Sequence, residues 1–120
     1  MIKIVSIKEN HLFSKVYAKG KNCAGKNLVV YALPNFKKPG KTMLGITASK
    51  KLGGAVQRSR ARRIIREAYR RAAGEKDFSR PYLIVVVARR PLFEKGRKMQ
   101  DLIPELRFAF NRLGLYGEEK

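Results

Sequence analysis

The sequence predicts an α+β fold, a small two-layer α/β sandwich in which helices pack on a sheet. Apolar residues recur at helical spacing in three segments, and three other segments are rich in β-branched and aromatic residues. These segments follow the order helix, strand, strand, helix, strand, helix. The 120 residues are 44% hydrophobic, enough for one core, so residues 1–120 are expected to form a single domain.

The first half of the chain contains the first helix and two strands. Residues 9–20 place four apolar side chains at helical spacing: Leu12, Phe13, Val16 and Tyr17. Residues 27–35 and 42–49 have the composition of strands, and a basic turn containing Pro and Gly separates them. We expect these two strands to pair as a hairpin.

The second half contains the central helix, a third strand and the last helix. The glycine pair at 53–54 interrupts the chain, and a helix is expected over residues 56–73. Residues 82–88, "YLIVVVA", are wholly apolar, which is typical of a strand in the middle of a sheet. The last helix is expected over residues 98–113, and Pro104 inside it predicts either a start at the preceding residue or a kink.

The central helix carries an unusual concentration of positive charge. In "KKLGGAVQRSRARRIIREAYRR", residues 50–71, nine of the 22 residues are Lys or Arg, and only Glu67 opposes them. One arc of the helix is apolar and is expected to face the core: Ala61, Ile64, Ile65, Ala68 and Ala72. An arginine ridge at i+4 spacing lies beside and behind that arc: Arg58, Arg62, Arg66 and Arg70.

This charge predicts a polyanionic partner. The formal net charge is +19, and neighbouring like charges on a helix destabilise it unless a partner supplies anions. Ordinary solvated helix faces mix Glu with Lys, whereas this helix uses Arg, which binds phosphate with two hydrogen bonds and stacks on bases. Nucleic acid is therefore the first candidate, ahead of an anionic membrane surface or a merely solvated face.

Nothing in the sequence predicts a catalytic residue or a metal site in the chain itself. His11 is the only histidine and Cys23 the only cysteine, so a nucleophile–base pair or a cysteine zinc site is not indicated. The nine acidic residues are scattered, and the i,i+4 neighbours Asp101 and Glu105 are expected on the outer face of the last helix. We expect a protein that binds, with no small-molecule substrate and no cofactor of its own.

The chain shows no feature that directs it to a membrane. Its N-terminal "MIKIVSIKENH" lacks the apolar core of a signal peptide. The longest purely apolar run, residues 83–88, is far shorter than the roughly 20 residues that span a bilayer. We therefore expect a cytoplasmic protein.

Residues 50–67 resemble the signature of the protein component of bacterial ribonuclease P, Lys-Lys-x-Gly-x-Ala-Val-x-Arg-Asn-Arg-x-Lys-Arg-x-x-Arg-Glu. This chain reads "KKLGGAVQRSRARRIIRE", with Ser59 where the family usually has Asn and Arg62 where Lys is common. The Ser59 difference removes an amide that can donate and accept at once. The resemblance extends over nearly the whole chain through "HLFSKVYAKG", "NLVVYALPN", "LGITASKK" and "YLIVVVARR".

The resemblance implies both a fold and a function. The implied fold is related to the second domain of ribosomal protein S5, with a left-handed crossover through the basic helix. In the family, a large RNA subunit with bound Mg²⁺ removes the 5′ leader from precursor tRNA. The chain would then be a subunit of an endoribonuclease whose chemistry the RNA carries, with the ribonuclease P RNA subunit and precursor tRNA as its partners.

The resemblance also assigns two surfaces by matching position. The surface for the RNA subunit would comprise Lys50, Lys51, Arg58, Ser59, Arg60, Arg62, Arg63 and Arg66, extended along the ridge by Arg70. A cleft between the sheet and the first helix would hold the leader and contain Phe13, Tyr17, Tyr31, Arg89 and Arg90, the two arginines being candidates for contacts to phosphates of either the leader or the RNA subunit. Aromatic stacking suits a single-stranded leader of variable sequence. Phe13 could instead serve only to pack the core. This alternative is weaker for Tyr17, because a tyrosine hydroxyl favours a position in contact with water.

Three other classes of protein share some of these features. A basic ribosomal or other structured-RNA-binding protein would have the same charge and fold class but no role in tRNA processing. A DNA-binding protein could insert the basic helix in a major groove, yet no helix precedes it at the short spacing of a helix-turn-helix. A membrane-surface helix would carry bulky apolar residues opposite its cations, whereas this arc is Ala and Ile.

Overall fold

The computed structural model describes residues 3–37, 40–94 and 97–116. The elements in chain order are β1 (Val5–Ser6), α1 (Asn10–Lys19), β2 (Lys21–Ala24), β3 (Leu28–Pro34), β4 (Met43–Thr47), η1 (Lys50–Leu52), α2 (Ala55–Ala73), β5 (Tyr82–Ala88), η2 (Arg90–Phe93) and α3 (Met99–Arg112). The three helices and three strands expected from the sequence are confirmed. The short strands β1 and β2 and the 3-10 helices η1 and η2 were not predicted.

The five strands form one mixed sheet in the order β1-β4-β5-β3-β2. β5 is central, parallel to β4 and antiparallel to β3. The predicted hairpin between β3 and β4 is therefore wrong, because β5 lies between them. The connection over residues 35–42 is longer than the two to five residues of most hairpin loops. The apolar β5, buried almost throughout, occupies the place expected of a central strand.

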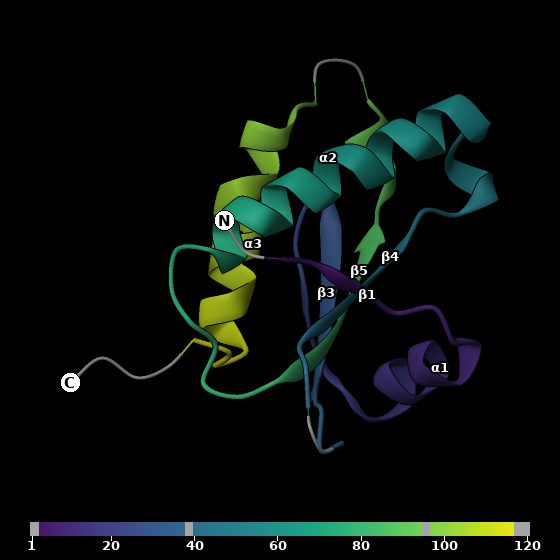
Figure 1. The fold of residues 1–120 in the computed structure, drawn as a ribbon. Coiled ribbons are helices and arrows are strands. Elements are labelled where there is room, and N and C mark those ends of the chain that lie inside the picture. The colour runs from purple at the N-terminus through teal and green to yellow at the C-terminus, as the bar shows by residue number, and fades with distance from the viewer. Residues whose placement is uncertain (1–2, 38–39, 95–96, 117–120) are drawn as a thin grey trace.

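The two faces of the sheet are covered differently. α2 and α3 cover one face and make the main two-layer sandwich, whereas α1 lies on the opposite face (Figure 1). Alternate residues of β3 and β5, including Val30, Ile84 and Val86, belong to the main core beneath α2 and α3. Val16 of α1 packs with Leu83 and the other residues of β5 that face α1, and together they form a smaller second core. The sandwich that the sequence predicts is thus confirmed, with α1 added outside it.

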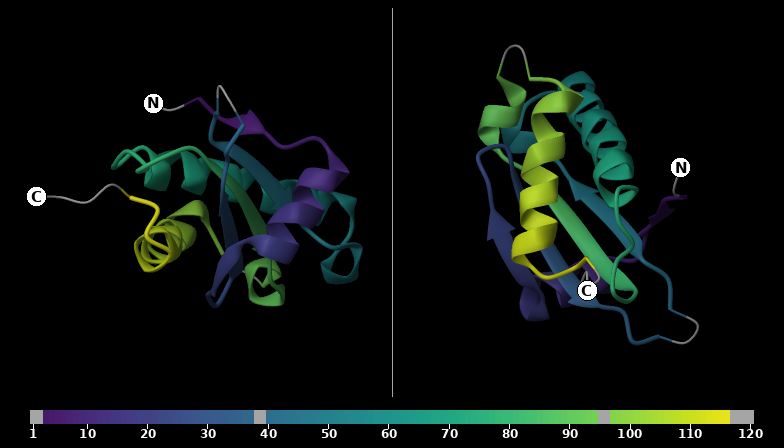
Figure 2. Two further views of the ribbon diagram at one scale, coloured as in Figure 1. Left: turned by 90° about the horizontal axis from the view of Figure 1, so that it is seen from below. Right: turned by 90° about the vertical axis from the view of Figure 1, so that its left-hand side faces the viewer.

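The connection from β4 through α2 to β5 joins two parallel neighbours by the rare left-handed route. In the right-hand view of Figure 2, α2 lies toward the viewer, the strands ascend, and β5 lies to the left of β4. Nearly all such crossovers are right-handed. The handedness implied by the family resemblance is confirmed.

The core-facing side of α2 is wider than its sequence pattern predicts. Four of the five expected positions are buried and Ile64 is half-buried. Tyr69 and Ala73 are buried as well, on the flank that faces β4. The broader contact stabilises a helix whose outer surface is crowded with cations.

The last helix runs without a break from Met99 to Arg112, so the predicted start just before Pro104 is wrong. The Asp101 carboxylate accepts the backbone N–H of Lys98 at 2.7 Å and caps the start of the helix. Pro104 lies in the second turn, where its missing N–H removes one helical hydrogen bond. Capping and burial of the inner face of α3 offset that loss.

Glu105 is not an outer-face residue as its spacing suggests, because its carboxylate anchors the turn between β2 and β3. It accepts the backbone N–H of Asn27 at 3.0 Å, the side-chain amide of Asn27 at 3.1 Å and the N–H of Leu28 at 2.7 Å. A Cβ on Gly25 would lie only 2.5 Å from the carboxylate. The glycine therefore permits the close approach of α3 to this turn.

Candidate nucleic-acid interface

The arginine ridge winds around α2 instead of following one line of exposed positions. Residues four apart advance by about 40° around a helix of 3.6 residues per turn. Arg58 and Arg62 are accordingly half-buried beside the core, and Arg66 is exposed. Arg60, Ser59, Arg63 and Arg71 are exposed on the remaining surface of α2. The helix therefore presents guanidinium groups on most of the surface that it does not bury.

Several of these arginines also make contacts within the fold. Arg60 donates to the carbonyl of Arg97 at 2.6 Å, and Arg70 is paired with Glu67 one turn earlier. The Nε of Arg58 is buried and has no hydrogen-bond partner among the described residues. A guanidinium has five N–H donors, so Arg60 and Arg70 retain donors for a ligand. Glu67 is the only acid on the helix and neutralises little of its charge.

Cations from two other segments gather at the end of the sheet where α2 begins. β4 and β5 are parallel, so the residues that follow each strand lie at the same edge. Lys50 and Lys51 follow β4 in η1, while Arg89 and Arg90 follow β5, and all four are exposed. Arg89 also donates to the carbonyl of Gly25. The structure thus places these four predicted residues near the start of the basic helix.

The predicted aromatic residues meet on the face of the sheet that carries α1. Tyr17 of α1 lies over the central strand, since its ring contacts Tyr31 on β3 and its hydroxyl contacts Thr47 on β4. The rings of Tyr17 and Tyr31 are edge to face with centroids 5.0 Å apart. The Tyr17 hydroxyl lies 3.0 Å from Thr47 Oγ1. Tyr17 is 40% exposed and Tyr31 is half-buried, so both rings remain accessible.

Phe13 shares this face but is used for packing. Its ring lies over Gly45, where an added Cβ would be 2.6 Å from the nearest ring carbon. Phe13 is half-buried and packs against the second core together with Tyr31. Gly45 is therefore the residue that lets α1 settle on β4. Phe13 therefore packs in the second core while part of its ring remains accessible to solvent. We call Phe13, Tyr17, Tyr31 and Thr47 together the aromatic surface.

Two residues of this face were missed by the sequence argument. Thr47 fixes the orientation of Tyr17, which only the three-dimensional strand order reveals. Phe36 is 75% exposed after β3 and lies beside α1 in a cavity also lined by His11 and Lys15. An aromatic residue next to Lys37, just after a strand, is a signal that the sequence did contain.

The described residues include no group of three or more His, Cys, Asp or Glu side chains that could hold a metal ion. Within the same ranges, no helix has the length and apolarity required to cross a bilayer. Fold and surface together define a small α+β protein with one strongly cationic helix, as in proteins that bind RNA.

Comparison with known proteins identifies the family. The family profile described as ribonuclease P matches residues 1–114. The ribonuclease P protein component of Clostridium acetobutylicum is 33% identical over 109 residues, covering 91% of this chain and 88% of that one. The Clostridioides difficile protein component is 46% identical over 83 residues, covering 69% and 70%.

Solved structures agree with this match. The Staphylococcus aureus RNase P protein superposes with a TM-score of 0.77 at 30% identity, covering 96% of this chain and 100% of that one. The Thermotoga maritima RNase P protein gives a TM-score of 0.73 at 25% identity, covering 91% and 94%. The chain belongs to the ribonuclease P protein family, whose members are the protein component of a tRNA-processing ribonucleoprotein.

Proposed function

We propose that this chain binds the RNA subunit of ribonuclease P through α2 and its flanking cations, and binds the 5′ leader of precursor tRNA on the aromatic surface. The observation that carries the proposal is the placement of the two sets of residues. The cations lie on α2 and at the adjoining edge of the sheet, while the stacking residues lie on the opposite face, on α1 and on β3 beside it. Two separate surfaces suit a protein that holds an RNA subunit and a substrate at the same time.

The cationic surface suits a folded RNA. Its exposed members come from η1, α2 and the end of β5: Lys50, Lys51, Ser59, Arg60, Arg63, Arg66, Arg89 and Arg90. Contacts from arginine to phosphate give affinity without reading sequence. Ser59 retains one hydroxyl donor in place of the usual amide, which is sufficient for a single phosphate or ribose contact.

The aromatic surface suits an unpaired strand. The rings of Tyr17 and Tyr31 are both partly accessible, and stacking tolerates any base. In this proposal the RNA subunit carries out the hydrolysis with bound Mg²⁺. The protein positions the leader and contributes positive charge that lowers the need for free cations.

A cleavage assay with a bacterial ribonuclease P RNA tests the proposal. At low Mg²⁺, adding the protein should accelerate removal of the leader from precursor tRNA, because protein cations replace part of the ionic screening. Arg66→Ala should weaken the stimulation, and Arg112→Ala, which removes an exposed arginine from α3, serves as the matched control. Binding to ribosomal RNA without any effect on leader removal would instead identify a protein that binds structured RNA for another purpose.

A further inference from the structure

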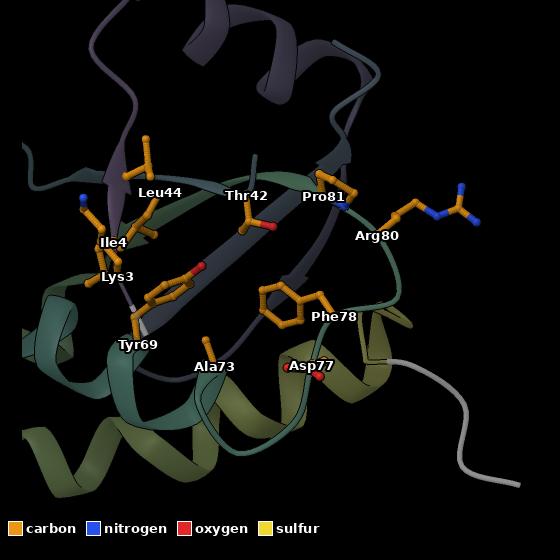
Figure 3. Close-up of a pocket in the computed structure, with 11 residues that line it drawn as sticks. Lys3, Ile4, Thr42, Leu44, Tyr69, Ala73, Asp77, Phe78, Arg80 and Pro81 are labelled. Carbon is orange, nitrogen blue, oxygen red and sulfur yellow. The ribbon is translucent and has the colours of Figure 1, made fainter. Parts of the chain in front are cut away.

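A cavity of about 340 Å³ lies between α2 and the β1–β4 edge of the sheet, on the opposite side of the sheet from the aromatic surface. Figure 3 shows Tyr69 and Phe78 on opposite sides of this space, with Thr42 and Pro81 along a third side. The volume is at the small end of the roughly 300–1,000 Å³ range of ligand pockets. It suits one ring system and is too small for a folded peptide.

The Tyr69 hydroxyl opens into this cavity and has no protein partner in the described residues. Tyr69 is only 3% exposed, and its hydroxyl makes no hydrogen bond with any residue in the described part of the chain. Figure 3 shows this hydroxyl directed into the space toward Thr42, whose own Oγ1 already accepts the N–H of Tyr82 at 3.2 Å. Burial raises the pKa of Tyr69 well above its ordinary value, so the hydroxyl stays protonated and can both donate and accept. The cavity therefore offers a ligand one hydroxyl that no side chain in the described ranges uses.

The charges around the cavity indicate what enters. Lys3 and Arg80 are exposed residues of its lining, and Figure 3 shows Arg80 extending outward from it. Arg62 and Arg66 precede Tyr69 and Ala73 by seven residues each, so they lie on the same flank of α2, about two turns away. A polyanion bound along that flank therefore runs toward the cavity, whose exposed lining contains the cations Lys3 and Arg80 and the acid Asp77.

We propose that this cavity binds the base of one unpaired nucleotide of RNA, with the backbone phosphates on Lys3, Arg80 and the nearby flank of α2. The base lies between Tyr69 and Phe78, and the Tyr69 hydroxyl meets a polar edge of the base. Asp77 at the rim can accept an exocyclic amino group, as carboxylates do from cytosine or adenine. This inference rests on the proposed function for the choice of RNA as the partner and for the source of the nucleotide. The leader occupies the other face of the sheet, so the nucleotide comes from the RNA subunit.

Titration of the full-length protein with adenosine 5′-monophosphate, followed by amide NMR shifts, tests the proposal. Ribose 5-phosphate is the matched probe because it carries the same sugar and phosphate without a base. The mononucleotide should shift the amide resonances of residues 42–44, 77–80 and 82 saturably, whereas ribose 5-phosphate should affect only the basic surface. Identical shifts from the two probes would overturn the proposal.

Two substitutions separate the cavity from general electrostatics. Ala73→Leu fills part of the space. It should lower the affinity for the mononucleotide by about tenfold, which is the effect of losing one stacking contact. Ala55→Leu makes the same change at an exposed position of the same helix and should leave affinity unchanged. Tyr69→Phe removes only the hydroxyl, so it should lower the affinity for the mononucleotide severalfold. The melting temperature should stay the same. Wild-type affinity in both Ala73→Leu and Tyr69→Phe would refute the assignment.

The mononucleotide assay does not use the ribonuclease P RNA, so its outcome is independent of the proposed function. A further measurement with that RNA assigns the source of the nucleotide. Ala73→Leu should weaken assembly with the RNA subunit and leave the ratio of precursor to mature tRNA affinity as in the wild type. A change in that ratio instead would contradict the assignment to the RNA subunit.

Discussion

Replacing Tyr17 with alanine should selectively remove the contribution of the leader to substrate binding. The Tyr17 ring is 40% exposed, is held edge-on to Tyr31 and is oriented by Thr47. One base stacked on an aromatic ring contributes about 1–3 kcal/mol, which corresponds to roughly a 5-fold to 150-fold loss of affinity. Mature tRNA has no leader, so its affinity should be nearly unchanged.

The same contacts set the stability cost of this substitution. The edge-to-face ring pair contributes about 0.5–1.5 kcal/mol, and an exposed hydrogen bond such as that to Thr47 contributes about 1 kcal/mol. A domain of this size has about 5–15 kcal/mol of stability, so Tyr17→Ala should remain folded. The melting temperature and the amide NMR spectrum of the variant check this.

The assay is equilibrium binding of precursor and mature tRNA to the holoenzyme assembled with each protein variant. Tyr17→Phe keeps the ring and should retain most of the leader affinity. Arg63→Ala combined with Arg66→Ala should weaken assembly with the RNA subunit and affect both tRNAs alike, because both side chains are exposed on α2. If folded Tyr17→Ala loses precursor and mature tRNA affinity equally, the aromatic surface does not bind the leader.

Three further results are expected. Glu105→Ala should destabilise the fold by about 2–4 kcal/mol in chemical denaturation, because the donors of the mostly buried Asn27 lose their acceptor; a change below about 0.5 kcal/mol would contradict the anchoring role. RNA affinity should fall with salt at a log–log slope of about −4 if some six phosphates are neutralised, and a slope near −1 would exclude α2 as the interface. The hydrogen bond from Arg107 lowers the pKa of Glu75 from its ordinary 4.5. The wild type should therefore melt at a slightly higher temperature than Glu75→Gln above pH 4.5, and this difference should shrink as the pH falls through the lowered pKa. A constant difference across that range would show that the pair does not affect stability.

Local pattern was sufficient to predict the helices and the longer strands. The apolar arc of α2 and the uninterrupted apolar run of β5 each encode their burial within one segment. Which strands pair depends on residues far apart in the chain, so the predicted β3–β4 hairpin was wrong and β1 and β2 were missed. The two residues of β1 and the mostly exposed β2 carry almost no periodic signal.

The candidate site, too, could be predicted from the sequence only in part. Charge density alone located the cationic helix, and the family resemblance located Phe13, Tyr17 and Tyr31; whether these residues bind RNA and leader stays a prediction. The sequence could not show that Tyr17 bridges to Thr47, because that contact crosses the central strand. It also could not show that the flank of α2 carrying Arg62 ends at the cavity beside Tyr69.

The central position of β5 determines when this protein can fold during its synthesis. Before residues 82–88 are made, the strand pairs of the described residues that can form are β1 with β4 and β2 with β3, and these two pairs are not joined to each other. Two-stranded ladders are at best marginally stable in water, so neither can hold the chain before the strand between them arrives. The basic helix is translated earlier and leaves the ribosome without a sheet to pack on. Assembly of the domain therefore begins only after residues 82–88 have been synthesised.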